Sequence, residues 1–90
     1  MLEIQYKNIF EKDVARAKKR GKDIEKLKEV IRLLAEEKLL PPKFRDHPLI
    51  GNYNGRRECH IEPNWLLVYK KKTNTIIFER TGTHSDLFSS

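Results

Sequence analysis

The second half of the chain constrains the fold most, because three strand-like segments follow one another there with almost no connecting residues. Residues 56–62 alternate between polar and apolar side chains, and residues 65–71 and 75–81 are rich in aliphatic and aromatic side chains. Pro63-Asn64 separates the first two segments and Thr73-Asn74 the last two, and both pairs are typical of tight turns. Strands joined by such short turns pair antiparallel, so we expect an antiparallel sheet.

The first half of the chain begins with a short alternating segment and continues with helical patterns. Residues 2–6 alternate in the manner of a strand. Asn8 and Glu11 then have the spacing of a capping box, and Gly21 follows a basic run as a helix terminator. Between these signals lies an apolar stripe at helical spacing, made of Phe10, Val14 and Ala17.

A second helix is indicated between Asp23, a candidate N-cap, and the pair Pro41-Pro42, which cannot continue a helix. Its apolar residues step by three and four positions along one face, as Ile24, Leu27, Ile31 and Leu34, with Val30 beside them. Because a tight glycine turn joins the two helices, we expect a helical hairpin. Residues 41–55 hold prolines, glycines and asparagines and predict an ordered loop.

The elements together predict an α+β fold of order β-α-α-β-β-β. The antiparallel sheet has the two-helix hairpin packed on one face, and the other face stays open. Ninety residues suffice for one small core, so we expect a single domain over residues 1–90.

Charge and composition narrow the classes of partner. The chain carries 19 Lys and Arg against 13 Asp and Glu, a formal net charge of +6, which favours a polyanionic partner: RNA, DNA or an acidic protein. One cysteine excludes an internal disulfide, and no apolar run reaches the length of a membrane span. The first residues alternate like a strand and do not resemble a signal peptide, so a cytoplasmic protein is the default expectation.

Three histidines are the candidate chemical groups. Strand alternation places Glu58 and His60 on the uncovered face, opposite the apolar Cys59 and Ile61. His47 lies in the loop before that strand, and His84 follows the last strand after a glycine break. We expect these segments to be able to converge at one end of the open face.

Zinc and nucleophilic catalysis fit the spacing poorly. There is no C-x-x-C or H-x-x-x-H pair, and Cys59 and His60 point to opposite sides of one strand. His84, Ser85 and Asp86 are consecutive, so their side chains cannot form a catalytic relay with one another. The sequence therefore predicts no metal site and no cofactor.

RNA cleavage without a metal fits the residue inventory better. It needs a base for the 2′-hydroxyl, an acid for the leaving 5′-oxygen and positive charge beside the phosphate, and histidine can serve as either acid or base. Positive charge is available from Arg56, Arg57 and Arg80. Trp65 and Phe88 could stack on unpaired bases, although core packing explains Trp65 equally well.

Three motifs with the correct order and spacing resemble one known family, the YafQ branch of the RelE/ParE toxin superfamily. They are Asp46-His47-Pro48-Leu49, the stretch from Arg57 through Pro63-Asn64-Trp65 to Tyr69, and Arg80-Thr81-Gly82-Thr83-His84-Ser85-Asp86-Leu87-Phe88. Lys12-Asp13 and Lys19-Arg20-Gly21 in the helical hairpin also fit, so the resemblance covers nearly the whole chain.

The resemblance implies a bacterial type II toxin with the RelE-like microbial ribonuclease fold. Such a toxin is a metal-independent mRNA endonuclease that cuts in the ribosomal A site and inhibits translation in the cytoplasm. The implied partners are the ribosome with its mRNA and a cognate antitoxin, and operator DNA is reached only through the antitoxin complex. No membrane partner is implied.

The resemblance also implies roles for individual residues. His84 matches the general acid, His47 and His60 match the other essential histidines, and Trp65 and Phe88 match the substrate-side aromatics. Asn64 departs from the family, which usually has Asp there, and an amide cannot take a proton, although it can hold a histidine or an RNA hydroxyl. Glu58 supplies a carboxylate beside His60. The general base stays open between His60 and His47, and we favour His60.

Two other hypotheses remain. The chain could be a non-catalytic module that binds RNA, the ribosome or an antitoxin, in effect a decayed toxin, and Asn64 is the feature that favours this alternative. A zinc-binding structural domain is the third hypothesis, and it would require stoichiometric metal.

Overall fold

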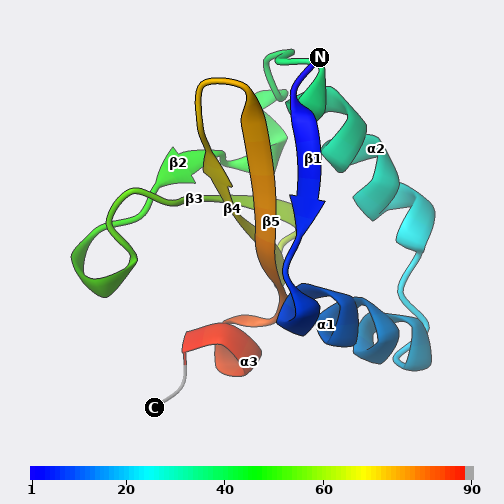
Figure 1. Ribbon diagram of the computed structural model, residues 1–90. Helices are drawn as coiled ribbons and strands as arrows, with labels where there is room; N and C mark the ends of the chain where they lie inside the picture. The colour runs from blue at the N-terminus through cyan, green and yellow to red at the C-terminus, as the bar shows by residue number, and fades with distance from the viewer. Residues whose placement is uncertain (89–90) are drawn as a thin grey trace.

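A computed structural model describes residues 1–88 of the chain (Figure 1). Two long helices precede most of the sheet, and a short helix ends the described part of the chain. In chain order the elements are β1 (Glu3–Tyr6), α1 (Asn8–Lys19), α2 (Ile24–Ala35), the 3-10 turn η1 (Pro42–Phe44), β2 (His47–Pro48), the 3-10 turn η2 (Gly51–Tyr53), β3 (Arg57–Glu62), β4 (Trp65–Lys71), β5 (Thr75–Gly82) and α3 (His84–Phe88).

The strands form one sheet in the order β1-β5-β4-β3-β2. The three strands expected from the tight turns are confirmed, because β3, β4 and β5 pair antiparallel in succession. The sheet is nevertheless mixed, since β1 runs parallel to β5, with Ile4 opposite Ile76. A fully antiparallel sheet was expected, and this detail was wrong. The chain between β1 and β5 passes through both helices and three strands, which is long enough to bring it back in either direction.

The loop expected over residues 41–55 contains short regular elements instead of irregular chain alone. Its most consequential part is β2, where His47 pairs with Glu58 and Pro48 with Arg57 on the edge of β3. A two-residue strand leaves almost no periodic signal, so the sequence did not reveal it. The pairing matters because it fixes His47 beside the strand that carries His60.

The helical hairpin covers one face of the sheet, as expected. Asp23 caps α2 by accepting a hydrogen bond from the Glu25 amide at 3.0 Å. Asn8 does not act as a cap: it is the first residue of α1, and Lys7 occupies the capping position without a side-chain bond. Most residues of the stripes predicted for both helices are buried in the main core, and Val14 and Ile24 are only partly buried against it. The buried core comprises Leu2, Phe10, Ala17, Leu27, Val30, Ile31, Leu34, Ala35, Cys59, Ile61, Trp65, Leu67, Tyr69, Ile76 and Phe78.

The second face of the sheet is less open than expected. Leu66 and Val68 of β4 are buried there under Leu87 of α3, and Leu49 and Phe88 pack against them. This small second cluster holds α3 on the face opposite the helical hairpin. No helix in residues 1–88 is long and apolar enough to cross a membrane.

Candidate active site

The register of the sheet gathers the chemical side chains on the second face. Glu58 of β3 lies opposite Val68 of β4, which lies opposite Arg80 of β5, and His47 of β2 lies opposite Glu58. Directly paired residues project to the same side of a sheet, so this row shares the face of Val68. Cys59 falls on the other face with the main core, as the alternation predicted.

The three histidines converge at this face, which confirms the expected convergence. The ring centroids of His47 and His60 are 6.4 Å apart, and those of His60 and His84 are 6.0 Å apart. Phe88, one turn after His84 in α3, continues the series at 6.1 Å. His60 of β3 is therefore the imidazole that neighbours both the one on β2 and the one on α3.

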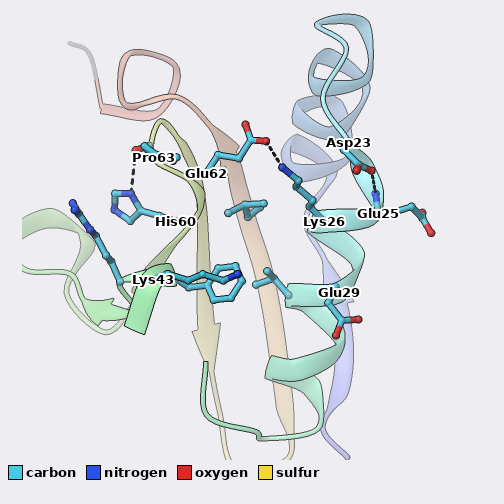
Figure 2. A pocket seen from close by; sticks show the side chains of 12 residues that line it. Asp23, Glu25, Lys26, Glu29, Lys43, His60, Glu62 and Pro63 are labelled. Carbon is cyan, nitrogen blue, oxygen red and sulfur yellow. Dashed lines mark hydrogen bonds and ion pairs between the residues drawn. The ribbon is translucent and has the colours of Figure 1, made fainter. Parts of the chain in front are cut away.

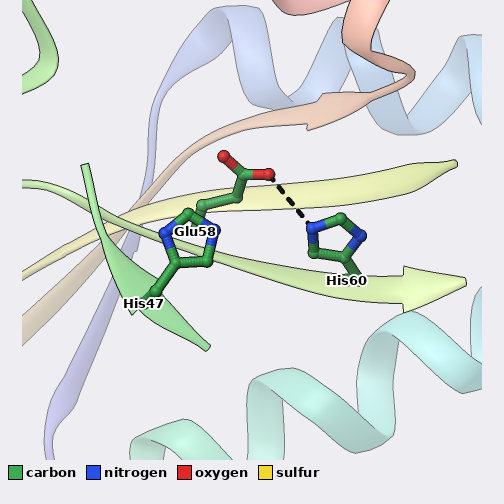
Figure 3. Close-up of side chains that lie close together, drawn as sticks. All are labelled: His47, Glu58 and His60. Atoms are coloured by element: carbon green, nitrogen blue, oxygen red, sulfur yellow. Dashed lines mark ion pairs between the residues drawn. The ribbon is translucent and has the colours of Figure 1, made fainter. Parts of the chain in front are cut away.

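Two of the imidazoles are fixed by backbone carbonyls. The Nδ1 atom of His60 lies 3.2 Å from the Pro63 oxygen, and the Nδ1 atom of His47 lies 3.0 Å from the Pro48 oxygen. A carbonyl oxygen can only accept, so Nδ1 is the donor in each of these bonds, and Nε2 is the ring nitrogen that faces away from the carbonyl. The Nε2 atom of His60 faces the Glu58 carboxylate at 3.4 Å (Figure 3).

Glu58 is a buried carboxylate, 4% exposed, and it belongs to a cluster of three metal-ligand types. One donor atom from each of His47, Glu58 and His60 lies within 4.8 Å of the other two. Searching for ligand pairs close in sequence does not reveal this cluster, because the pairing of β2 with β3 brings His47 to Glu58. The spacing argument that excluded a metal site therefore does not apply to these residues.

His84 begins α3, and two features position its backbone: the cap of that helix and a contact with Asn64. Thr83 and Asp86 form a reciprocal capping box: the Thr83 amide donates to Asp86 at 2.9 Å, and the Asp86 amide donates to Thr83 at 3.1 Å. The His84 amide lies 3.4 Å from the Asn64 side-chain oxygen, which ties α3 to the turn between β3 and β4. The His84 side chain is exposed.

Gly82 allows α3 to fold back on the end of β5. A Cβ atom at this position would lie 2.8 Å from an Asp86 carboxylate oxygen and 3.1 Å from the Arg16 guanidinium, so a larger residue would collide with the cap of α3. The glycine break expected from the sequence is thus a requirement of close packing.

An ion-pair network joins α1, β5 and α3. Asp86 accepts from Arg20 at 2.7 and 3.2 Å, and Arg16 lies 3.7 Å away. The Arg20 guanidinium, followed by the Thr83 amide, holds the pKa of Asp86 well below its usual range. Buried Asp13 accepts from Arg80 and Arg16 and from the Thr81 amide, at 2.8 to 3.2 Å. The network fixes the segment that carries His84.

The three arginines predicted to face RNA differ in their positions. Arg80 lies on the histidine face and uses Nε and Nη2 for its fork on Asp13. Arg56 pairs with the buried carboxylate of Glu79. Arg57 projects from the opposite face, where it contacts Asp46, which also accepts a hydrogen bond from the Tyr69 hydroxyl at 2.6 Å. Strand alternation separates Arg57 from the histidines, so the geometry does not support the prediction that it belongs to this site.

The two predicted stacking aromatics also differ. Trp65 is 1% exposed in the main core, and its Nε1–H donates to the Thr81 hydroxyl at 2.9 Å. No ring face is accessible to a base, so its assignment as an RNA contact was wrong. Phe88 is only partly buried and meets Tyr53 edge-on, with centroids 5.2 Å apart. Tyr53 was missed; its only sequence signal is an aromatic residue within a Gly- and Asn-rich loop.

Beside the site, a groove of about 610 Å³ lies between α2 and the end of β3 (Figure 2). His60 reaches its rim from β3, and Lys26 and Glu62 form an ion pair across it at 3.0 Å. Other charges of both signs line it: Asp23, Glu25, Glu29, Lys43 and Arg45. This mixture of charges does not favour a polyanion in the groove.

The single cysteine takes no part in this chemistry. Cys59 is fully buried on the main-core face, and burial raises the pKa of its thiol far above the usual range. The thiol therefore stays protonated at neutral pH and is not a nucleophile.

Comparisons with known proteins agree in sequence and in structure. Residues 2–89 match the family model described as a bacterial toxin of type II toxin-antitoxin systems, YafQ. The mRNA interferase toxin YafQ of Escherichia coli strain K12 is 47% identical over 87 residues, which cover 96% of this chain and 95% of that protein.

Solved structures add the same likeness at full length. YafQ in the E. coli DinJ–YafQ complex superposes with a TM-score of 0.93 at 44% identity, covering 99% of this chain and all of that one. A metal-bound toxin from Helicobacter pylori gives 0.93 at 44% identity, covering 98% of this chain and all of that one.

Proposed function

The chain belongs to the YafQ family of bacterial toxins of type II toxin-antitoxin systems, and from that premise we propose how it acts. It is an mRNA interferase that cleaves mRNA in the ribosomal A site and thereby inhibits translation. The observation that carries this proposal is the proximity of three imidazoles on one face, with the ring centroids of His60 and His84 6.0 Å apart. A spacing of this size can place a base and an acid, each at about 3 Å, on either side of one phosphate.

His60 acts as the general base. With its Nδ1–H bound to the Pro63 carbonyl, the neutral ring presents Nε2 as the acceptor for the 2′-hydroxyl proton. The Glu58 carboxylate, 3.4 Å from Nε2, stabilises the imidazolium that forms. His47 lies at the same edge and borders the substrate on the side of β2.

His84 acts as the general acid and protonates the leaving 5′-oxygen. It is exposed at the first position of α3, where its ring can reach bound RNA, and Asn64 fixes its backbone. Asn64 is then a positioning residue, which removes the difficulty that an amide cannot serve as a base. Phe88 and Tyr53 supply an aromatic surface for a base beside His84.

Positive charge for the phosphate comes from Arg80. Two of its nitrogens are held by Asp13, so the guanidinium is oriented before substrate arrives, and that fork leaves Nη1 for a phosphate oxygen. Acid, base and charge all come from side chains, so the reaction as proposed requires no metal ion.

The partners follow from the same family. Because the E. coli relative was solved in complex with DinJ, a cognate antitoxin protein is expected to neutralise this chain. The pair then reaches operator DNA through the complex. The net charge of +6 favours association with ribosomal RNA and mRNA. The proposed site of action is accordingly the bacterial cytoplasm, where translation occurs.

The decisive experiment replaces the proposed acid. His84→Ala is expected to abolish growth arrest and to lower cleavage of a translated message at least about 100-fold, as loss of general acid catalysis does. Glu3→Ala is the matched control, because Glu3 is exposed on β1 at the opposite edge of the sheet. Undiminished cleavage by His84→Ala would refute the assignment.

Two further readouts test the finer claims. Primer extension on the message, with and without ribosomes, is expected to show new ends only when the message is being translated. That cleavage should persist when a chelator selective for transition metals is added and the Mg²⁺ that ribosomes need is kept. Tight binding to ribosomes or antitoxin without any new ends would instead indicate the non-catalytic module.

A further inference from the structure

A buried carboxylate on β5 lies outside the histidine cluster, and the proposed chemistry makes no use of it. Glu79 is 6% exposed. Val68 lies opposite Arg80 and Tyr69 lies opposite Phe78, so Glu79 is an extra residue at a bulge between these two pairs. Bulges redirect a side chain and are frequent beside active sites. Here Glu79 meets Arg56, whose Nε atom donates to its carboxylate.

Arg56 lies on the same face of the sheet as the histidine cluster. It immediately precedes β3 and is two positions from Glu58, and residues two apart in a strand project to one side. Lys70 is likewise two positions after Val68 in β4 and shares this face. Two positions span roughly 7 Å along a strand, so Arg56 and Lys70 lie one step beyond the row that contains Arg80.

We propose that Arg56, oriented by Glu79, binds the RNA phosphate next to the one that is cleaved. Arg80 is the cation proposed for the cleaved phosphate, and an extended strand of RNA presents its next phosphate at a distance similar to the separation of the two rows. The ligand of this surface is therefore single-stranded RNA, held at two successive phosphates. This inference deepens the proposed function and rests on it.

Glu79 orients Arg56 without occupying the end of its side chain. One carboxylate oxygen accepts from Nε of Arg56, and the other contacts Nζ of Lys7 at 3.1 Å. The terminal nitrogens of Arg56 then form an edge that suits two oxygens of a phosphate. The Arg56 side chain is 28% exposed, so a ligand can reach it from solvent. Orientation in advance reduces the entropy that is lost when the phosphate binds.

The charge at this point stays positive after pairing. Burial by itself would raise the pKa of Glu79, but Arg56 and Lys7 together outweigh it and hold that pKa below its usual range. Glu79 is therefore ionised at neutral pH and cancels only one of its two cations. Half-buried Lys70 adds a further positive charge on the same face. This surplus of cations around one buried carboxylate favours the binding of another anion.

The salt dependence of RNA binding tests the site. The titrations use the His84→Ala chain, which should bind RNA without cutting it, and a short labelled single-stranded RNA between about 50 and 200 mM KCl. Arg56→Gln in this chain should weaken binding about tenfold at low salt and reduce the slope of log affinity against log salt by about 0.7, the value of one phosphate contact. Arg56→Lys should keep the slope but lose part of the affinity, because an ammonium keeps the charge and lacks the fork.

Arg32→Gln is the matched control. It removes the same charge from an arginine that is also paired with carboxylates, but Arg32 lies on α2, which covers the other face of the sheet. Its salt slope should equal that of the His84→Ala chain. An unchanged slope in Arg56→Gln, or an equal fall in Arg32→Gln, would overturn the phosphate site.

Glu79→Gln tests the positioning role of the buried carboxylate. The variant gains a net positive charge, so electrostatic attraction alone predicts tighter RNA binding, whereas loss of orientation at Arg56 predicts weaker binding. Tighter or unchanged binding would refute the role of Glu79. If this variant fails to fold, the Arg56 variants still decide the phosphate site, since Arg56 is partly exposed. If the parent chain never cleaves a translated message, the proposed function fails while the binding result stands.

Discussion

Arg20 of α1 holds Asp86 of α3 with two hydrogen bonds, of 2.7 and 3.2 Å, although 66 positions separate the two residues in sequence. Asp86 also caps the short helix that begins at His84. The ion pair therefore fixes α3, and with it the imidazole proposed as the acid, relative to the helical hairpin. Its energetic value to the fold is small, because Arg20 is largely exposed.

Replacing Arg20 should consequently reduce activity more than stability. We expect Arg20→Met to lower cleavage about tenfold or more, because a displacement of the acid by about 1 Å costs up to about 100-fold. The melting temperature should change little. Arg32→Met is the matched control: it also removes one positive charge, but Arg32 pairs with Glu29 and Glu36 within or just beyond α2. Equal losses of cleavage in both variants would show that charge alone matters.

The same carboxylate should make the anchoring of α3 sensitive to acid. The folded-state pKa of Asp86 is lowered, first by Arg20 and then by the Thr83 amide, with Arg16 also facing it. A carboxylate whose pKa is lowered by folding stabilises the fold in full above the unfolded value of about 3.9. This contribution is lost progressively as the pH falls from that value towards the lowered folded-state pKa. Melting temperatures of the parent and Asp86→Asn should differ by a constant amount above about pH 5 and converge below about pH 4. A gap that persisted at low pH would contradict this.

Asp13 should matter far more to stability than its neighbours on α1. It is 3% exposed, and it satisfies Arg80, Arg16 and the Thr81 amide at once. Asp13→Ala leaves these groups without their acceptor, so we expect a loss of about 3 kcal/mol in the free energy of unfolding, the lower end for a broken buried pair. Urea denaturation measures it. Glu11→Ala, at an exposed position of the same helix, should change that free energy by less than about 0.5 kcal/mol.

These contacts show where sequence reasoning reached the fold and where it stopped. The β3–β4–β5 pairing could be predicted because its turns are local, and the helix stripes because their period is local. The parallel pairing of β1 and the existence of β2 could not, since each depends on chain far away in sequence. Asp13 lies between the apolar stripe residues of α1, and a polar residue in that position indicates a buried polar contact.

The candidate site shows the same division. Alternation placed Glu58 and His60 correctly, but their meeting with His47 depends on β2, and that of His60 with His84 on α3. Trp65 could have been placed from alternation, since it shares a strand face with Leu67 and Tyr69 in the main core.

Substitution of Trp65 tests directly whether this side chain belongs to the core and not to the RNA-binding surface. Trp65→Phe removes the hydrogen bond to the Thr81 hydroxyl and part of a buried ring, so it should destabilise the fold by about 1–3 kcal/mol. RNA affinity, measured on the folded protein, should be unchanged. Phe88→Ala should instead weaken RNA binding by roughly 1–3 kcal/mol, the value of one base stacked on an aromatic ring. Reversal of these two outcomes would restore Trp65 as an RNA contact.

Asn64 separates a positioning role from a proton-transfer role at the turn between β3 and β4. Its side-chain oxygen accepts from the His84 amide at 3.4 Å, and a carboxylate can accept the same bond. Asn64→Asp should therefore retain cleavage with the pH profile of the parent, whereas Asn64→Ala should lower cleavage about tenfold by freeing the start of α3. Single-turnover cleavage between about pH 5 and pH 9 checks both variants. If the introduced carboxylate were to act as the base, Asn64→Asp would gain activity and shift the acidic limb of the profile, and His60 would lose that assignment.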